Sequence, residues 1–339
     1  MTAAAPPVAP VAPATLPPSR GSTVARIVRR NQWTVGLIVL LVIFLGITKM
    51  LAPNYGAPQI ESLAISAMPI ALASVAQAIV VISGGIDLSI GSVMAFTSVT
   101  AAVLMQGQSE EVAIAVVLGV LLLGVLIGAL NGILVVVTRV PDIVVTLAMS
   151  FVWAGAALLV INTPGGGSAQ WLKDLLDGTV LSEWIPRALV VLIGIVAVVW
   201  IPVMRSKLGV SMYAVGSNRL AAFRSGVHVG RTKVAAYALT GFFASVGGLA
   251  LTASTGIGTP VPGPYTLQSV AAVVLGGVSL AGGRGGLIGP ILAVIILGLV
   301  RADLTFIGVN PNLSTALQGA ILVGVVMFGA VVTFRRSRR

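Results

Sequence analysis

The sequence has few charged residues. Only 9% of its 339 residues are Asp, Glu, Lys or Arg, against about 25% in a typical soluble domain. Hydrophobic residues make up 57% of the chain, and the mean hydropathy is +1.07. A soluble fold could not cover its surface with polar side chains at this composition, and a disordered chain needs low hydrophobicity. The composition excludes both a soluble enzyme and a disordered scaffold.

Reactive side chains are also scarce. There is no cysteine, and His228 is the single histidine, which excludes disulfides, thiolate metal sites and multi-histidine metal sites. No G-x-x-x-x-G-K-[ST] pattern occurs, so the chain supplies no such phosphate-cradling loop for ATP. One histidine on a basic stretch does not make a Ser-His-Asp arrangement. We therefore expect no enzyme activity and no bound cofactor.

Long apolar runs fill most of the chain. Because one membrane crossing needs roughly 20 apolar residues, the sequence predicts an all-α, polytopic transmembrane helical bundle with about ten spans. The run at 287–300 is short for a full crossing. The expected spans are 33–51, 60–82, 88–105, 112–137, 143–161, 187–204, 232–254, 266–281, 287–300 and 313–334.

The net charge of +11 comes from 20 basic and 9 acidic residues. The basic residues lie between apolar runs, which favours membrane orientation over nucleic-acid binding. With the N-terminus in the cytoplasm and ten crossings, 16 of the 20 basic residues fall inside and seven of the nine acids fall outside. The positive-inside rule predicts this asymmetry of Lys and Arg. An even number of spans, with both termini cytoplasmic, is therefore favoured.

Two organisational features flank and interrupt the spans. Residues 1–30 are rich in Pro and Ala and end in several arginines, which predicts a disordered, basic cytoplasmic tail. This segment lacks the pattern of a secretory signal, and residues 31–339 are expected to form the transmembrane domain. Glycine breaks interrupt apolar runs at 83–87 and 282–286. Paired breaks of this kind point to discontinuous helices at a transport path, although chance similarity in an Ala/Gly/Val-rich chain is the alternative.

A few polar side chains are candidates for a solute path. Asp87 stands between two long apolar runs; it is either a structural helix cap or a path or gating residue, because a carboxylate at depth is costly. The amides of Gln77, Asn131 and Gln268 either bind hydroxyl-rich solutes or join helices. The stripe of Gly124, Gly128 and Gly132 is interpreted as a close helix contact.

The polar connection from Arg205 to Lys233 holds six basic residues and no acid. The charges alone fit a loop that sets topology. Its segment 220–223 is also short and apolar enough to form a helix against the membrane. The functional alternative is a docking surface for a cytoplasmic partner. Acids suited to ion coupling are scarce, so energy for uphill transport would come from another subunit.

Three sequence motifs resemble those of a known protein family. SGGIDLSIGS at 83–92, GSNRLAAFRSG at 216–226 and LGGVSLAGGRG at 275–285 resemble, in order and spacing, the patterns of the ribose-type (monosaccharide) permeases of bacterial ABC importers. The likeness runs from about residue 33 to the C-terminus. It implies a multi-pass subunit of the bacterial plasma (inner) membrane that moves a monosaccharide, such as a ribose-, xylose- or galactose-like sugar or a polyol, by alternating access.

The resemblance also implies partners. These are a cytoplasmic ATPase that binds ATP, an extracytoplasmic sugar-binding protein and a second permease subunit that makes a homodimer, all within membrane lipid and without nucleic acid. It assigns contact with the ATPase to a coupling loop formed by Gly216, Asn218, Ala221, Ala222, Ser225 and Gly226. Many ABC permeases have a glutamate before the paired alanines, whereas this chain has Arg219-Leu220. Docking is therefore expected to use the small alanine surface and its basic flanks.

Three alternatives to a sugar importer stay open from the sequence. The first is a stand-alone secondary transporter, the second is an ABC permease for a solute other than a sugar, and the third is a membrane-embedded assembly scaffold.

Overall fold

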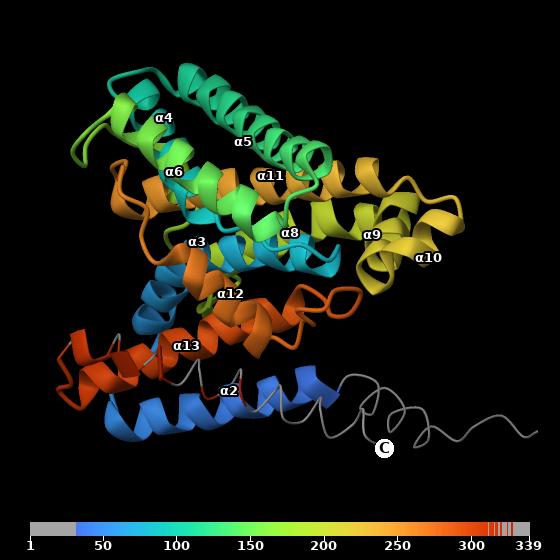
Figure 1. Ribbon diagram of the computed structural model, residues 1–339. Coiled ribbons are helices and arrows are strands. Elements are labelled where there is room, and N and C mark those ends of the chain that lie inside the picture. The colour runs from blue at the N-terminus through green and yellow to red at the C-terminus, as the bar shows by residue number, and fades with distance from the viewer. Residues whose placement is uncertain are drawn as a thin grey trace, which may run out of the picture.

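The computed structural model describes residues 32–310 and scattered positions between 312 and 327. In this part of the chain, seven helices are long and apolar enough to cross a membrane. They lie side by side in a bundle (Figure 1). The seven are α2 (Gln32–Leu51), α3 (Ala57–Ile82), α5 (Glu110–Thr138), α6 (Asp142–Val160), α8 (Arg187–Arg205), α11 (Val229–Thr255) and α13 (Ile288–Phe306).

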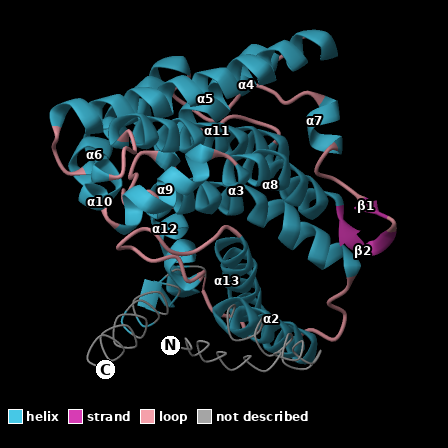
Figure 2. Ribbon diagram, turned by 90° about the vertical axis from the view of Figure 1, so that its right-hand side faces the viewer, coloured by secondary structure: helices cyan, strands magenta, loops and turns pink. Residues whose placement is uncertain are grey.

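Shorter elements complete the described fold. Two of them are apolar helices, α4 (Ile90–Met105) and α12 (Tyr265–Leu275). The helices α9 (Lys207–Ser217) and α10 (Arg219–Arg224) lie together at one end of the bundle (Figure 1), which we call the α10 end. The other elements are α7 (Gln170–Asp174) and the antiparallel strands β1 (Thr179–Val180) and β2 (Ser182–Pro186), which flank the helices (Figure 2).

The helical, polytopic prediction is confirmed, but the details differ. The expectation of no strands missed the β1–β2 hairpin. The predicted run 266–281 ends as a helix at Leu275, because Gly277 takes a left-handed φ of +79°, which favours glycine. The segment expected at 287–300 is longer than predicted, reaching Phe306 and the length of a span. The tail at 1–30 and most of 313–334 lie outside the described residues, and ten spans are not established.

The core lies around α3 and α11. In α3, 83% of the most apolar window is buried inside the protein, whereas the corresponding windows of α2, α6 and α8 are 11% buried. A Cβ atom on Gly128 of α5 would overlap the backbone of Tyr237 in α11, and one on Gly124 would lie 2.6 Å from the carbonyl oxygen of Gly241. The glycine stripe therefore makes the close contact between α5 and α11 that the sequence predicted, inside one chain.

The short helices α4 and α12 meet at their N-termini. The backbone N–H of Gly91 in α4 donates to Thr266 Oγ1 of α12 at 2.9 Å. A Cβ atom on Gly91 would lie 2.7 Å from that oxygen, so glycine permits the approach. At the other end of α12, Trp33 Nε1 of α2 donates to the carbonyl oxygen of Leu275 at 2.8 Å. This bond satisfies one of the carbonyls that a helix C-terminus leaves without an intrahelical partner.

Candidate functional site

The three glycine motifs meet at the α10 end, although they come from distant parts of the chain. Gly84 follows α3, Gly216 is in the last turn of α9, and Gly282 and Gly283 lie between α12 and α13. The N–H of Gly283 donates to the carbonyl oxygen of Ile82 at 2.9 Å. A Cβ atom on Gly216 would overlap that carbonyl and lie 2.6 Å from the nitrogen of Gly283. We call this contact the glycine junction, and only residues without a side chain permit it.

The motif at 216–226 builds the α10 helix. Asn218 is the N-cap, and its Oδ1 accepts the N–H of Ala221 at 2.9 Å, which satisfies a donor at the helix start. Ser225 is the C-cap, and its N–H donates to the carbonyls of Ala221 and Ala222. Gly226 follows with φ of +83°, the left-handed conformation common just past a helix end. The predicted short helix at 220–223 lies within α10 (Arg219–Arg224).

The surface of α10 differs from the predicted alanine surface. Ala222 is buried and packs with Val215 and Val229, so this residue holds α10 against its neighbours. Ala221 is exposed, and beside it Leu220 and Phe223 are exposed at 58% and 67%. The face available to a partner is therefore apolar, with Arg219 and Arg224 as its basic flanks.

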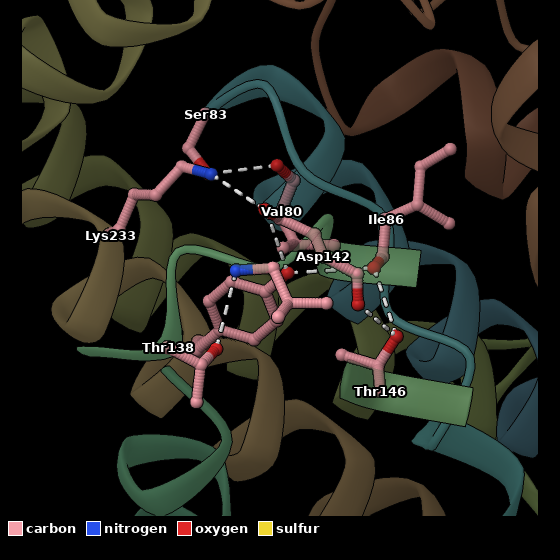
Figure 3. Close-up of polar contacts among 9 residues, drawn as sticks. Val80, Ser83, Ile86, Thr138, Asp142, Thr146 and Lys233 are labelled. Carbon is pink, nitrogen blue, oxygen red and sulfur yellow. Dashed lines mark hydrogen bonds and ion pairs between the residues drawn. The ribbon is translucent and has the colours of Figure 1, made fainter. Parts of the chain in front are cut away.

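A buried ion pair joins α6 to α11 beside the loop that follows α3 (Figure 3). Lys233 Nζ of α11 lies 2.7 Å from Asp142 Oδ2 of α6, and the two side chains are 6% and 16% exposed. The hydroxyl of Tyr237 donates to the same Oδ2 at 3.0 Å. Thr146 Oγ1 donates to the carbonyl of Ile86 at 3.2 Å, and this hydroxyl accepts the N–H of Leu88 at 3.0 Å. Tyr237 of α11 also contacts the carbonyl oxygen of Ile86, at 3.5 Å. Both α6 and α11 therefore contact the backbone of this loop.

Lys233 is the last residue of the predicted basic connection and also falls inside the predicted span 232–254. It lies in the first turns of α11 and is buried. Its carboxylate partner, Asp142, was not predicted as a site residue. One signal in the sequence could have pointed to this site. Lys233 comes four residues before Tyr237 at the start of an apolar run, and residues four apart lie on the same face of a helix. A second signal was an acid directly after Pro141 at the start of another run.

Two of the four path candidates are joined by Ser89. Asp87 is 2% exposed, and its Oδ1 accepts both the N–H and the hydroxyl of Ser89, at 2.8 and 2.6 Å. The amide of Asn131 in α5 donates to Ser89 Oγ at 2.8 Å. Trp153 Nε1 of α6 donates to Asn131 Oδ1 at 3.3 Å, and its ring stacks on Phe96 of α4. This chain joins the start of α4 to α5 and α6.

The capping prediction for this stretch holds in part. Asp87 accepts the N–H of Ser89, one residue before α4 begins. Ser89 itself is the N-cap, but its side chain makes no capping bond to the helix. Its hydroxyl instead takes part in the chain between Asp87 and Asn131.

The other two path candidates lie apart from this chain. Gln77 of α3 is fully buried, and neither its Oε1 nor its Nε2 has a hydrogen-bond partner. Gln268 of α12 lines a cavity between α3, α12 and α13. Within the described residues, no group of three His, Cys, Asp or Glu side chains could hold a metal ion.

Comparison with known protein families gives a match over most of the chain. Residues 59–326 match the model of a family described as the branched-chain amino acid transport system / permease component. The chain belongs to this permease family. A curated relative, the autoinducer 2 import system permease protein LsrD of Yersinia enterocolitica, is 31% identical over 89% of this chain and 92% of its own length.

The LsrD protein of Escherichia coli K12 is also 31% identical, over 91% of this chain and 95% of its own length. No solved structure matches the chain. Membership of the family makes the chain a permease subunit of an ABC-type importer, not an enzyme, and a multi-pass protein of the inner membrane. Such a subunit works with an ATPase and a substrate-binding protein.

Proposed function

We propose that this permease moves a small, hydroxyl-rich solute of the sugar class by alternating access, with the glycine junction as the coupling element. The observation that carries the proposal is the contact of Gly216 with both Ile82 and Gly283. Through it, the α9–α10 unit touches the loop between α3 and α4 and the loop between α12 and α13. A partner that moves α10 therefore acts on the ends of four helices at once.

We place the α10 end in the cytoplasm. Arg205, Lys207, Arg219, Arg224 and Arg231 lie on or between α8, α9, α10 and α11 at that end. Lys and Arg are enriched on the cytoplasmic side of membrane proteins.

The ATPase would dock on the exposed face of Leu220, Ala221 and Phe223. Exposed apolar groups with basic flanks fit a partner groove that has apolar walls and an acidic rim. ATP binding and hydrolysis on that partner would bias the permease between two states, as coupling requires.

The solute class rests on the relatives and on the polar groups of the bundle. The relatives are import permeases for autoinducer 2, whereas the motifs resemble those of ribose-type permeases. An uncharged amide such as that of Gln268, which lines a cavity, can exchange hydrogen bonds with hydroxyl groups. Autoinducer 2 and the sugars ribose, xylose and galactose are therefore the first solutes to test. We further propose that two copies of this chain form the membrane unit.

The test is uptake by the assembled importer. The permease is co-purified with its ATPase, reconstituted in proteoliposomes with the binding protein, and supplied with labelled D-ribose or autoinducer 2. We expect one of these solutes to accumulate only with ATP, and an excess of the preferred solute to compete. Accumulation of an amino acid or nucleoside, with no competition by any sugar-class solute, would overturn the proposed solute class.

A further inference from the structure

A hollow of about 100 Å³ opens between α3, α12 and α13. Its walls are mostly apolar, but Ser66 of α3, Gln268 of α12 and Arg301 of α13 also line it. A Cβ atom on Gly298 would lie 2.7 Å from Leu63 Cδ1, so the absence of a side chain there keeps the space open. Since one liquid water occupies about 30 Å³, the hollow has room for several water molecules or a small solute.

The hollow lies along the helices rather than at their ends. Ser66 is nine residues from the start of α3 and Arg301 is five from the end of α13, or about 14 Å and 8 Å at the rise of an α-helix. Both side chains are exposed in the single chain. A charged or polar group at depth is costly against lipid and normally faces a bundle interior or a water-filled space. Snorkelling could carry the Arg301 head towards the interface, but it gives no account of Ser66 or Gln268.

A second observation continues this polar line towards the α10 end. Leu63, Ile70 and Gln77 are spaced by seven residues on α3, and seven residues are close to two helical turns. Leu63 and Ile70 line the hollow, so Gln77 lies on the same stripe, two turns further on. Its amide is fully buried without a partner, although a buried amide normally has one. Pro69 lies between Leu63 and Gln77 on α3 and removes one backbone hydrogen bond of that helix, which weakens the helix there.

We propose that this hollow is a water-filled part of the solute path and a binding subsite for a hydroxyl-rich solute. Gln268 and Ser66 would donate and accept hydrogen bonds with solute hydroxyls, and Arg301 would donate to solute oxygens. The amide of Gln77 would meet the solute further in, once α3 shifts. The subsite rests on the proposed function, because its ligand is the solute that the importer carries.

The first test uses the absence of cysteine from the native chain. Single variants S66C and Q268C are made in the full-length protein, and membranes are treated with a charged, water-soluble methanethiosulfonate reagent. The control is L118C, at an exposed apolar position of α5. Only the thiolate reacts with this reagent. A lipid environment raises the pKa of a thiol, and each unit of that increase lowers the labelling rate about tenfold. We expect S66C and Q268C to react at least about tenfold faster than L118C.

Labelling after denaturation in SDS confirms that every variant carries one thiol. Equal rates for S66C, Q268C and L118C in intact membranes would overturn the proposal, because the hollow would then face lipid. This test needs neither a known solute nor the ATPase, so its result stands even if the proposed function fails.

The second test uses the assembled importer and whichever of D-ribose or autoinducer 2 it accumulates. Replacing Gln268 with Leu removes a hydrogen-bonding group worth about 1 kcal/mol, which corresponds to about a fivefold rise in KM for uptake. The control is Leu267→Ala, which alters an exposed neighbour on α12 outside the lining. An unchanged KM for Q268L, in an importer that transports normally, would refute the subsite.

Discussion

Replacing Lys233 with methionine would leave the Asp142 carboxylate without its cation inside the bundle. The two groups lie 2.7 Å apart, and both side chains are largely buried. Removing one partner of a buried ion pair costs about 3–5 kcal/mol, because the remaining charge is uncompensated. We therefore expect Lys233→Met to lower the free energy of unfolding by about that amount. The loss should also loosen the loop after α3, because Tyr237, which donates to Asp142, also contacts the carbonyl oxygen of Ile86 in that loop.

The double variant Lys233→Met/Asp142→Asn separates charge from shape. It removes both charges and leaves an amide oxygen to accept the hydroxyl of Tyr237. We expect the double variant to be more stable than Lys233→Met, with a coupling free energy of roughly 2–3 kcal/mol between the two positions. This recovery is expected because the cost of the single change lies mainly in the uncompensated charge.

The assay is unfolding of the purified permease in mixed micelles with increasing SDS, followed by circular dichroism. The control is Lys207→Met, which alters an exposed lysine of α9 and should change stability by less than about 0.5 kcal/mol. If Lys233→Met behaves like Lys207→Met, or if the double variant loses as much as the two single variants added together, the ion pair does not stabilise the contact between α6 and α11 and the reasoning is wrong.

Three further predictions concern packing and docking. Gly128→Val should lower the free energy of unfolding, in the same assay, by more than about 1–3 kcal/mol, because the new side chain overlaps the backbone of Tyr237. The control Gly119→Ala, whose new Cβ atom has nothing within 4 Å, should leave the free energy of unfolding unchanged or raise it. Phe223→Ala should weaken binding of the ATPase by about 2 kcal/mol, seen as reduced co-purification with normal membrane insertion. Unchanged binding would exclude α10 as the docking face. Asn131→Leu should lower thermal stability by about 1–3 kcal/mol through the unsatisfied Ser89 and Trp153, and an unchanged melting temperature would contradict this.

The long apolar helices could be predicted from hydropathy because each crossing needs one continuous apolar run. The boundaries failed where a single backbone conformation decides them. Residues 276–281 are apolar enough to extend α12, but Gly277 at positive φ ends the helix. The hairpin β1–β2 is short and has no strong alternation of apolar and polar residues, so hydropathy did not predict its strands.

The site was predictable in its motifs but not in its contacts. The segment 216–226 carries both caps of α10, Asn218 and Ser225, and the left-handed Gly226 that follows, all of them recognisable from the sequence. The meeting of Gly84, Gly216 and Gly283 depends on how three helices pack, and spacing along the chain does not encode it. Lys233 falls inside the predicted span 232–254, but its pairing with Asp142 was not predicted, because counting charges along the chain does not show which of them meet inside the bundle.

The fate of the four path candidates makes the same point. Asp87 and Asn131 are 44 positions apart in sequence yet are linked through Ser89. Gln268 lies elsewhere, on the hollow. Residue type indicated that each of them is unusual in an apolar chain, but only the packing shows which of them act together.

The most direct test of the coupling role is solute uptake per ATP hydrolysed by the assembled importer carrying Gly216→Ala. An alanine Cβ atom there would overlap the carbonyl of Ile82, so it should separate α9 from the two loops while leaving the exposed face of α10 for the ATPase. The control is Gly155→Ala, where nothing lies within 4 Å. We predict that Gly216→Ala still assembles and hydrolyses ATP but transports fewer solute molecules per ATP, whereas Gly155→Ala does not change the ratio. An unchanged ratio for Gly216→Ala would contradict the glycine junction as the coupling element.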